Sequence, residues 1–153
     1  MAGRDYVSLG QVELQRPVVP PPIEVYNLRQ RPAVAVGDFT LLGYDAFKRG
    51  FDHAPDTPIR AGDEVQVTLL WQARAANPRL TPPLADDGCC LRVSRGDQGQ
   101  TVPIAPLAAL RQLAPGETVI TRAIVPIPPD FPPGRYDVTV GDIRAGGLDI
   151  APP

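Results

Sequence analysis

Prolines restrict this sequence more than any other feature, because they disfavour long helices and the interior of a sheet wherever they occur. The chain has 20 prolines among 153 residues, about 13% against a usual ~5%. One dense cluster, residues 128–134 (PPDFPPG), predicts a stiff corner at which Gly134 reverses the chain. Apolar residues then alternate with polar ones at Tyr136, Val138 and Val140, the period of a half-buried strand. We therefore expect a corner that joins two sheets of an all-β domain.

The same period of two marks other strands. The clearest pattern covers residues 65–71, where Trp71 is the largest candidate for the core. Phe39 and Leu41 share one face of an earlier strand, and Gly43 suggests a bulge or a close contact there. This earlier strand is expected over residues 36–45, and further strands are expected over residues 89–94, 101–104, 119–127, 135–143 and 148–151. The sequence also predicts a polar loop over residues 46–58, a short helix over residues 106–113 and a turn at Ala145-Gly146-Gly147.

These elements predict an immunoglobulin-like antiparallel β-sandwich of seven to nine strands, since Tyr136 just after the corner resembles the tyrosine near the start of strand F in that fold. We expect the sandwich over residues 36–153. Residues 1–35 are predicted to be an extension with a Pro-rich segment at residues 16–23 and one short strand around Val12 and Leu14. The Pro-rich segment is interpreted as a stiff linker or strap, and the alternative is a ligand for an aromatic-lined groove.

Charge and hydropathy exclude several classes of partner. The net charge is −2, and the 15 cations are spread along the chain without the basic stripe that nucleic acid requires. No run approaches the ~20 apolar residues of a membrane-spanning helix, and residues 1–10 lack the apolar core of a signal peptide. We therefore expect a soluble chain that inserts into no membrane by itself, although it could be a fragment of a longer exported or anchored protein.

Few residues suggest a metal or a nucleophile. Cys89 and Cys90 are adjacent, so in a strand their side chains point to opposite faces, and we expect structural cysteines, with a vicinal disulfide as the alternative. Together with His53, the only histidine, they make a poor zinc set. His53 is expected to be a solvated loop residue, because the sequence shows no serine motif for it to activate.

Acidic pairs and one tripeptide complete the candidates for chemistry. Asp63-Glu64 and Asp86-Asp87 lack the ligand spacing of a calcium loop and are interpreted as turn residues. Residues 95–97 spell Arg-Gly-Asp, which fits a hairpin turn better than an adhesion motif. The sequence thus predicts no catalytic residue, no cofactor and no metal. Its only candidate contacts for a ligand are the rings of Tyr44, Phe47 and Phe51, which could stack on a glycan.

Three segments together carry a resemblance to a known family. They are FTLLGYD (residues 39–45), AGDEVQVTLLWQA (residues 61–73) and LAPGETVITRAIVPIPPDFPPGRYDVTVG (residues 113–141). Their order resembles the C-terminal extracytoplasmic β-sandwich domain of bacterial, Chloroflexi-type, dolichyl-phosphate-mannose mannosyltransferase-like membrane glycosyltransferases. The resemblance covers about residues 7–145. The end departs from the family, because residues 140–144 read VGDIR where the family has a strand like VGLYD.

The resemblance implies an accessory domain outside the cytoplasm and carries over no catalytic residue. We therefore expect a non-catalytic accessory or interaction domain of a larger membrane-associated glycosyltransferase-like protein. Its partner would be the membrane portion of that protein or a glycan. The alternative is a carbohydrate-binding module, which would require exposed aromatic rings gathered on one face or loop end. A free-standing enzyme is the least favoured hypothesis.

Overall fold

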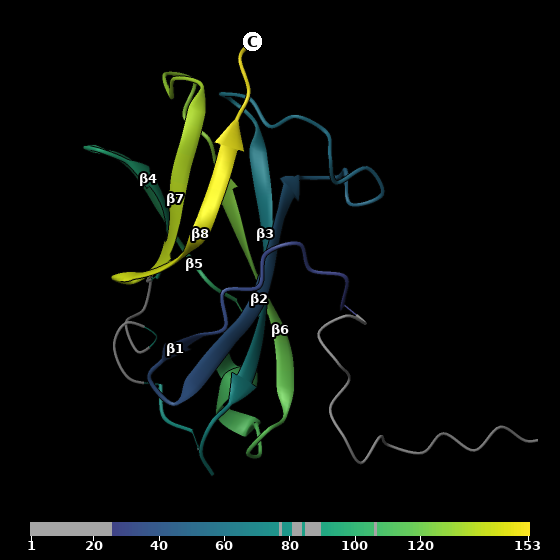
Figure 1. Ribbon diagram of the computed structural model, residues 1–153, viewed down its shortest axis with the longest axis vertical. Helices are drawn as coiled ribbons and strands as arrows, with labels where there is room; N and C mark the ends of the chain where they lie inside the picture. Colours follow the sequence, from purple (N-terminus) through teal and green to yellow (C-terminus); the bar gives the residue numbers. More distant parts are fainter. Residues whose placement is uncertain (1–25, 77, 81–83, 85–89, 106) are drawn as a thin grey trace, which may run out of the picture.

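The chain folds into two antiparallel four-stranded sheets that face each other across one hydrophobic core. The computed structural model describes residues 26–76, 78–80, 84, 90–105 and 107–153 (Figure 1). The strands are β1 (Val34–Val36), β2 (Phe39–Lys48), β3 (Glu64–Ala73), β4 (Cys90–Arg95), β5 (Gln98–Pro103), β6 (Thr118–Pro126), β7 (Gly134–Val140) and β8 (Ile143–Ile150). One short 3-10 helix, η2 (Leu107–Gln112), lies between β5 and β6.

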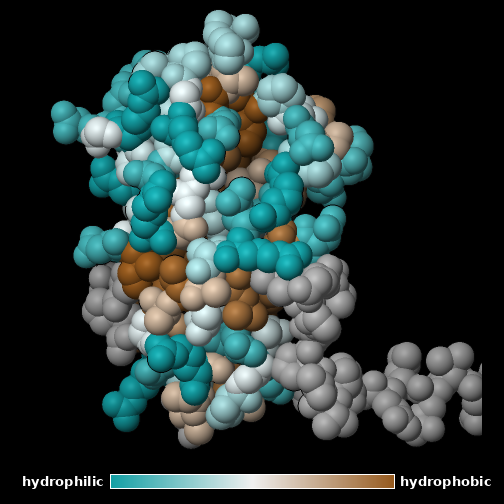
Figure 2. All heavy atoms as spheres, viewed as in Figure 1, coloured by the Kyte–Doolittle hydropathy of each residue, from teal (hydrophilic) through white to brown (hydrophobic). Residues whose placement is uncertain are grey.

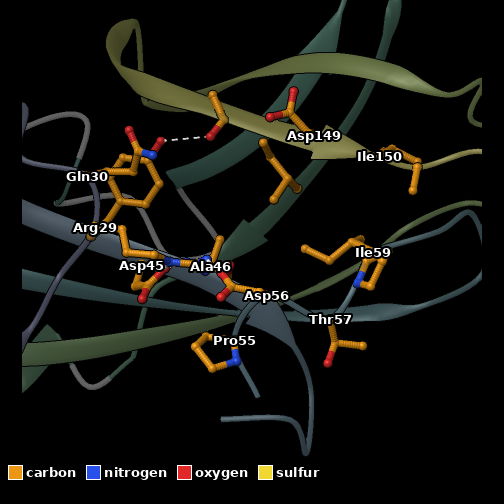
Figure 3. Close-up of a pocket in the computed structure, with 15 residues that line it drawn as sticks. Arg29, Gln30, Asp45, Ala46, Pro55, Asp56, Thr57, Ile59, Asp149 and Ile150 are labelled. Carbon is orange, nitrogen blue, oxygen red and sulfur yellow. Dashed lines mark hydrogen bonds and ion pairs between the residues drawn. The ribbon is translucent and has the colours of Figure 1, made fainter. Parts of the chain in front are cut away.

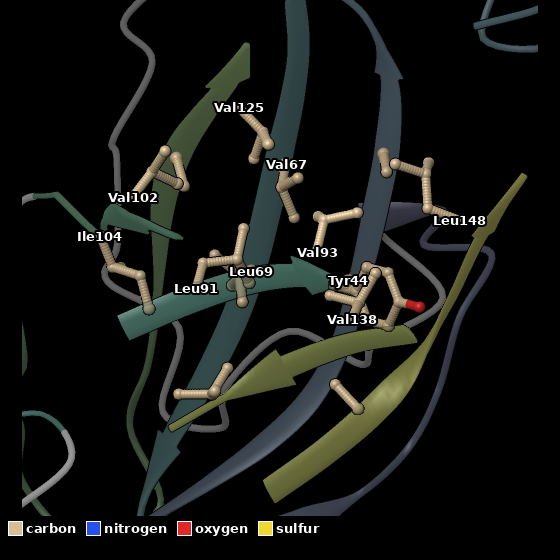
Figure 4. Close-up of a cluster of buried hydrophobic side chains, with 14 of the residues drawn as sticks. Tyr44, Val67, Leu69, Leu91, Val93, Val102, Ile104, Val125, Val138 and Leu148 are labelled. Carbon is tan, nitrogen blue, oxygen red and sulfur yellow. The ribbon is translucent and has the colours of Figure 1, made fainter. Parts of the chain in front are cut away.

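One sheet has the order β1-β2-β3-β6 and the other the order β5-β4-β7-β8. Along each strand, every second side chain faces inward for most of its length. The inward side chains of the two sheets meet in the core (Figure 4). Trp71 is fully buried there, as its position in the sequence predicted. Its indole Nε1 donates to Thr121 Oγ1 at 2.8 Å, so the one buried polar side chain among the described residues has a partner. The register also places Thr121, Ala123 and Val125 of β6 inside.

The proline corner joins β6 of one sheet to β7 of the other, as predicted. Gly134 has a φ of 141°, a conformation that disfavours any side chain. The Tyr136 hydroxyl donates to the carbonyl oxygen of Pro132 at 2.9 Å, and its ring stacks on Phe131 with a centroid distance of 5.0 Å. These contacts fix the angle at which the chain changes sheets.

Several sequence predictions about the ends of strands are wrong. The strand expected over residues 36–45 is interrupted by a turn at Gly37-Asp38, which separates β1 from β2. The turn expected at residues 145–147 lies instead at Gly141-Asp142, so β7 ends at Val140 and residues 145–147 lie within β8. Gly141 adopts a φ of 57°, which makes a two-residue hairpin turn accessible there. The loop expected from residue 46 begins later, because β2 continues to Lys48.

A β-bulge reverses the inward face of β2. Phe39 and Leu41 face the core, but the register shifts between Leu41 and Gly43, and beyond it Tyr44 and Ala46 face the core. The bulge expected at Gly43 is therefore present. Without it, strict alternation from Leu41 would turn Tyr44 to the outer face of the sheet.

A second bulge has the same effect in β8. Its register shifts opposite Val138 and Thr139, so that Ala145 and then Leu148 and Ile150 are buried.

The chain that precedes β1 also packs on the sandwich. Leu28 is 5% exposed, and Gln30 forms an isolated antiparallel bridge with Tyr44. The predicted strand around Val12 and the Pro-rich segment at residues 16–23 lie outside the described residues.

Candidate functional site

A groove opens on the side of the sandwich where β2 and β8 border the two sheets. β1 pairs only with residues 39–41 of β2, which leaves the rest of that strand at the margin of its sheet. β8 ends the other sheet. The cavity between them has a volume of about 410 Å³ and is completed by the loop at residues 55–59 (Figure 3). This volume falls within the range of small-ligand sites.

Tyr44 forms one end of the groove and links the two sheets. Its hydroxyl donates to the carbonyl oxygen of Gly147 at 3.1 Å (dashed line in Figure 3). Gly146 lies against the hydroxyl end of the ring, and a Cβ there would fall 3.2 Å from two ring carbons and closer still to the hydroxyl. Burial raises the pKa of the Tyr44 hydroxyl above 10.0, although the bond to Gly147 and nearby arginines act in the opposite direction.

The opposite end of the groove is closed by the backbone. The N–H of Ala151 donates to the carbonyl oxygen of Ile59 at 2.7 Å, next to a parallel bridge between Arg60 and Ala151. The buried aliphatic side chains of Ile59, Leu148 and Ile150 form the apolar part of the lining. Figure 2 shows such an apolar area surrounded by polar residues beside the C-terminal end of β8.

Arg29 holds the polar rim on the β2 side. Its Nε donates to Asp45 at 2.7 Å, its Nη1 to Asp56 at 2.9 Å, and its Nη2 to the carbonyl oxygen of Ala46 at 2.9 Å. The carboxylate of Asp45 also accepts from the Ala46 N–H at 2.8 Å. Both backbone groups of Ala46 are therefore occupied, which closes the margin of β2 against pairing with another strand.

The three rings predicted to contact a glycan do not form one surface. Tyr44 is fully buried, because the bulge turns it into the core, and it presents no ring face to solvent. Phe47 is half-buried on β2. Phe51 is 37% exposed, and among the described residues it is the one large hydrophobic side chain that is classed as exposed. Only Phe51 is thus clearly available for stacking on a sugar.

Phe51 belongs to a small cluster in the loop after β2. Its ring stacks on His53 with a centroid distance of 6.1 Å and an interplanar angle of 18°. Lys48 Nζ lies 5.5 Å from the centre of the same ring and forms an ion pair with Asp63 at 2.8 Å. His53 itself is exposed and lies 3.8 Å from Asp52, so it is a solvated loop histidine as expected.

Of the acidic pair expected in the turn before β3, Asp63 lies in that turn, whereas Glu64 begins β3. The Asp63 carboxylate accepts from the Arg60 N–H at 2.9 Å and thereby fixes the turn before β3. Partial burial acts to raise the pKa of Asp63, but the hydrogen bonds from Lys48 and Arg60 outweigh it and lower the pKa below 3.8. Glu64 pairs with Arg49 at 2.6 Å on the surface. Asp86-Asp87 lie outside the described residues.

The remaining motifs show structural roles. Of residues 95–97, Gly96 and Asp97 form the hairpin turn between β4 and β5, whereas Arg95 ends β4. Arg95 Nη1 donates to the carbonyl oxygen of Pro133 at 2.9 Å, so its guanidinium supports the proline corner. Cys90 begins β4, whereas Cys89 lies outside the described residues. Among the described residues, no group of three His, Cys, Asp or Glu side chains is placed to hold a metal ion.

Sequence reasoning missed the groove and its rim. Arg29 lies in a segment assigned to the extension, and Asp45 and Asp56 are ordinary surface acids until the fold brings them together. The one usable signal was the pair Gly146-Gly147, since glycines inside a strand mark a close approach of other groups. From the sequence alone, this pair predicts a turn.

Comparisons with known proteins give no match: no family model, no curated protein and no solved structure resembles this chain closely enough to be significant. Within the described residues, no helix has the length and apolar character that crossing a membrane requires.

Proposed function

We propose that this chain is a non-catalytic interaction domain of a larger membrane-associated glycosyltransferase-like protein, located outside the cytoplasm. The groove between β2 and β8 carries the proposal, because it combines an apolar lining with a polar rim on one side of the sandwich. Its ionic groups are held in ion pairs at the rim, as Arg29 is by Asp45 and Asp56. Such an arrangement suits recognition of a partner more than proton transfer.

The proposed architecture is the immunoglobulin-like sandwich. Its support is the division of the seven long strands into β2-β3-β6 and β5-β4-β7-β8, with the chain crossing between the sheets after β3, β5 and β6. The bond from the Tyr136 hydroxyl to the Pro132 carbonyl oxygen, four residues upstream, further supports it as a counterpart of the tyrosine corner. The resemblance of residues 39–45, 61–73 and 113–141 supports the link to the membrane glycosyltransferases.

The test begins with the gene that encodes this chain in its host. If the proposal is right, the same reading frame encodes membrane spans before the domain. A photo-crosslinking amino acid at Thr57, on the groove, should then capture the membrane portion of that protein. The matched control is the same amino acid at Asp142, in the turn between β7 and β8, which should capture little. A frame without membrane spans, or equal capture at both positions, would contradict the proposal.

A carbohydrate-binding module is the second candidate, favoured by the exposed ring of Phe51 stacked on His53. A glycan array followed by calorimetry at millimolar sugar tests it. Binding that is lost in Phe51→Ala and retained in Phe47→Ala would establish this function. Because Phe51 is partly exposed, its replacement should leave the free energy of unfolding within about 0.5 kcal/mol of the wild type.

A further inference from the structure

The groove contains one stretch of strand with unused backbone groups. In β8, the carbonyl oxygen of Gly147 accepts from Tyr44, and the N–H of Ala151 donates to Ile59, so both residues direct these groups away from β7. Backbone groups alternate in direction along an antiparallel strand. Asp149, midway between them, therefore directs its N–H and its C=O away from β7 and toward the groove. Outside the β7–β8 ladder, neither group has a backbone hydrogen-bond partner among the described residues.

The side-chain geometry agrees with this assignment. Asp149 is paired with Arg135 of β7, and the guanidinium Nη1 lies 3.1 Å from its carboxylate. Side chains approach most closely at the pairs that share no backbone hydrogen bonds. The carboxylate of Asp149 thus belongs to the outer face of the sheet, whereas its backbone lines the groove.

The free stretch is short because both of its ends are occupied. Tyr44 closes it at Gly147, and Ile59 closes it at Ala151. A ligand that satisfies one N–H and one C=O in strand geometry is itself an extended peptide, whose facing residue supplies the complementary C=O and N–H. Side chains beside that residue would meet the aliphatic lining formed by Ile59 and Ile150.

Charge at the rim favours a basic residue in that peptide. Arg29 is engaged by two carboxylates and a carbonyl oxygen, so its single positive charge leaves Asp45 and Asp56 with one negative charge in excess. A lysine or arginine as the paired residue would bring its positive charge to this partly exposed rim.

We propose that the groove binds a short extended peptide segment with a basic residue, which adds to β8 as a strand at Asp149. This inference rests on the proposed interaction function and names its partner class. The other margin of the groove, at Ala46, is closed by Arg29 and Asp45, so strand addition is directed to β8 alone.

Amide resonances of the whole 153-residue chain test this by nuclear magnetic resonance, with acetyl-Val-Lys-Val-amide as the probe. We expect shifts centred on Asp149 and Ala151, and slower hydrogen exchange at the Asp149 N–H. The decisive control is the same peptide N-methylated at lysine, which keeps every side chain but lacks the donor to Asp149. Its affinity should fall at least about tenfold, since a backbone hydrogen bond is lost and an acceptor is left unpaired.

A charge-matched set tests the basic preference. Acetyl-Val-Glu-Val-amide should bind more weakly than the lysine peptide. Asp56→Asn should reduce the difference in affinity between the lysine and glutamate peptides. Asp52 is another exposed loop acid but lies outside the groove, so Asp52→Asn should leave this difference unchanged.

Equal binding of the N-methylated peptide, or no shift at Asp149, would overturn the proposal, and shifts there caused by oligosaccharides but not peptides would make the groove a glycan site. If peptides fail while Thr57 still crosslinks the membrane portion, the interaction function stands and only strand addition is wrong.

Discussion

The hydroxyl of Tyr44 lies 3.1 Å from the carbonyl oxygen of Gly147 and thereby joins β2 of one sheet to β8 of the other. Figure 4 shows this ring with its hydroxyl directed toward β8. Both strands are bulged near this contact, at Leu41/Gly43 and opposite Val138/Thr139. The two bulges bring a tyrosine and a glycine pair into contact across the open side of the sandwich.

Replacing Tyr44 with Phe should destabilise the domain by about 1 kcal/mol, because the hydroxyl-to-Gly147 hydrogen bond is lost while the ring stays. The raised pKa of Tyr44 also gives a prediction for alkaline pH. The unfolded chain ionises this group at a lower pH than the folded chain, so the contribution to stability is complete below about pH 10 and declines above it. Between pH 8 and pH 10.5, the free energy of unfolding measured with urea should therefore decline less in Tyr44→Phe than in the wild type. An identical decline would contradict the assignment.

Gly146→Ala should destabilise the domain by about 1–3 kcal/mol, because the new methyl group would overlap the Tyr44 side chain. A double-mutant cycle with Tyr44→Val identifies the cause. If the ring is responsible, the alanine should cost much less when the ring is absent. Additive costs, measured by urea unfolding, would indicate that Gly146 is required for its backbone alone.

The buried pair Trp71 and Thr121 offers a test of the core. Trp71→Ala should cost about 3–5 kcal/mol, as expected for a large aromatic side chain in the core. Thr121→Val should cost about 1–3 kcal/mol, because the indole N–H would be buried without an acceptor. Blue-shifted fluorescence of Trp71 that is insensitive to quenchers would verify its burial, whereas ready quenching would contradict it.

Asp63→Asn should remove part of the acid sensitivity of the domain. The lowered pKa means that the folded chain binds fewer protons than the unfolded chain below pH 4, so this carboxylate stabilises the fold above its unfolded pKa and the effect is lost as pH falls. We expect a loss of about 1 kcal/mol at pH 7 and a smaller difference at pH 2.5, measured by urea unfolding. Asp97→Asn in the β4–β5 turn is the control, and an equal response in both variants would refute the role of Lys48 and Arg60.

Sequence periodicity determined the strands, the proline corner and the burial of Trp71, because these depend on local backbone restrictions and on which residues avoid water. The corner at residues 128–134 could be located from proline geometry alone, and the alternation of residues 65–71 located the inner face of β3.

Only the tertiary structure decided the side of Tyr44, the position of the last hairpin and the groove. A bulge changes the inward face of a strand by a single residue. Gly43 suggested a bulge or a close contact in FTLLGYD, but only the register shows that the inward face changes there and turns Tyr44 into the core. The turn was likewise placed at Gly146-Gly147 because glycines favour turns, whereas in the fold they make room for Tyr44 and Arg135. The rim at Arg29, Asp45 and Asp56 and the unpaired backbone of Asp149 arise from long-range register, which local sequence does not encode.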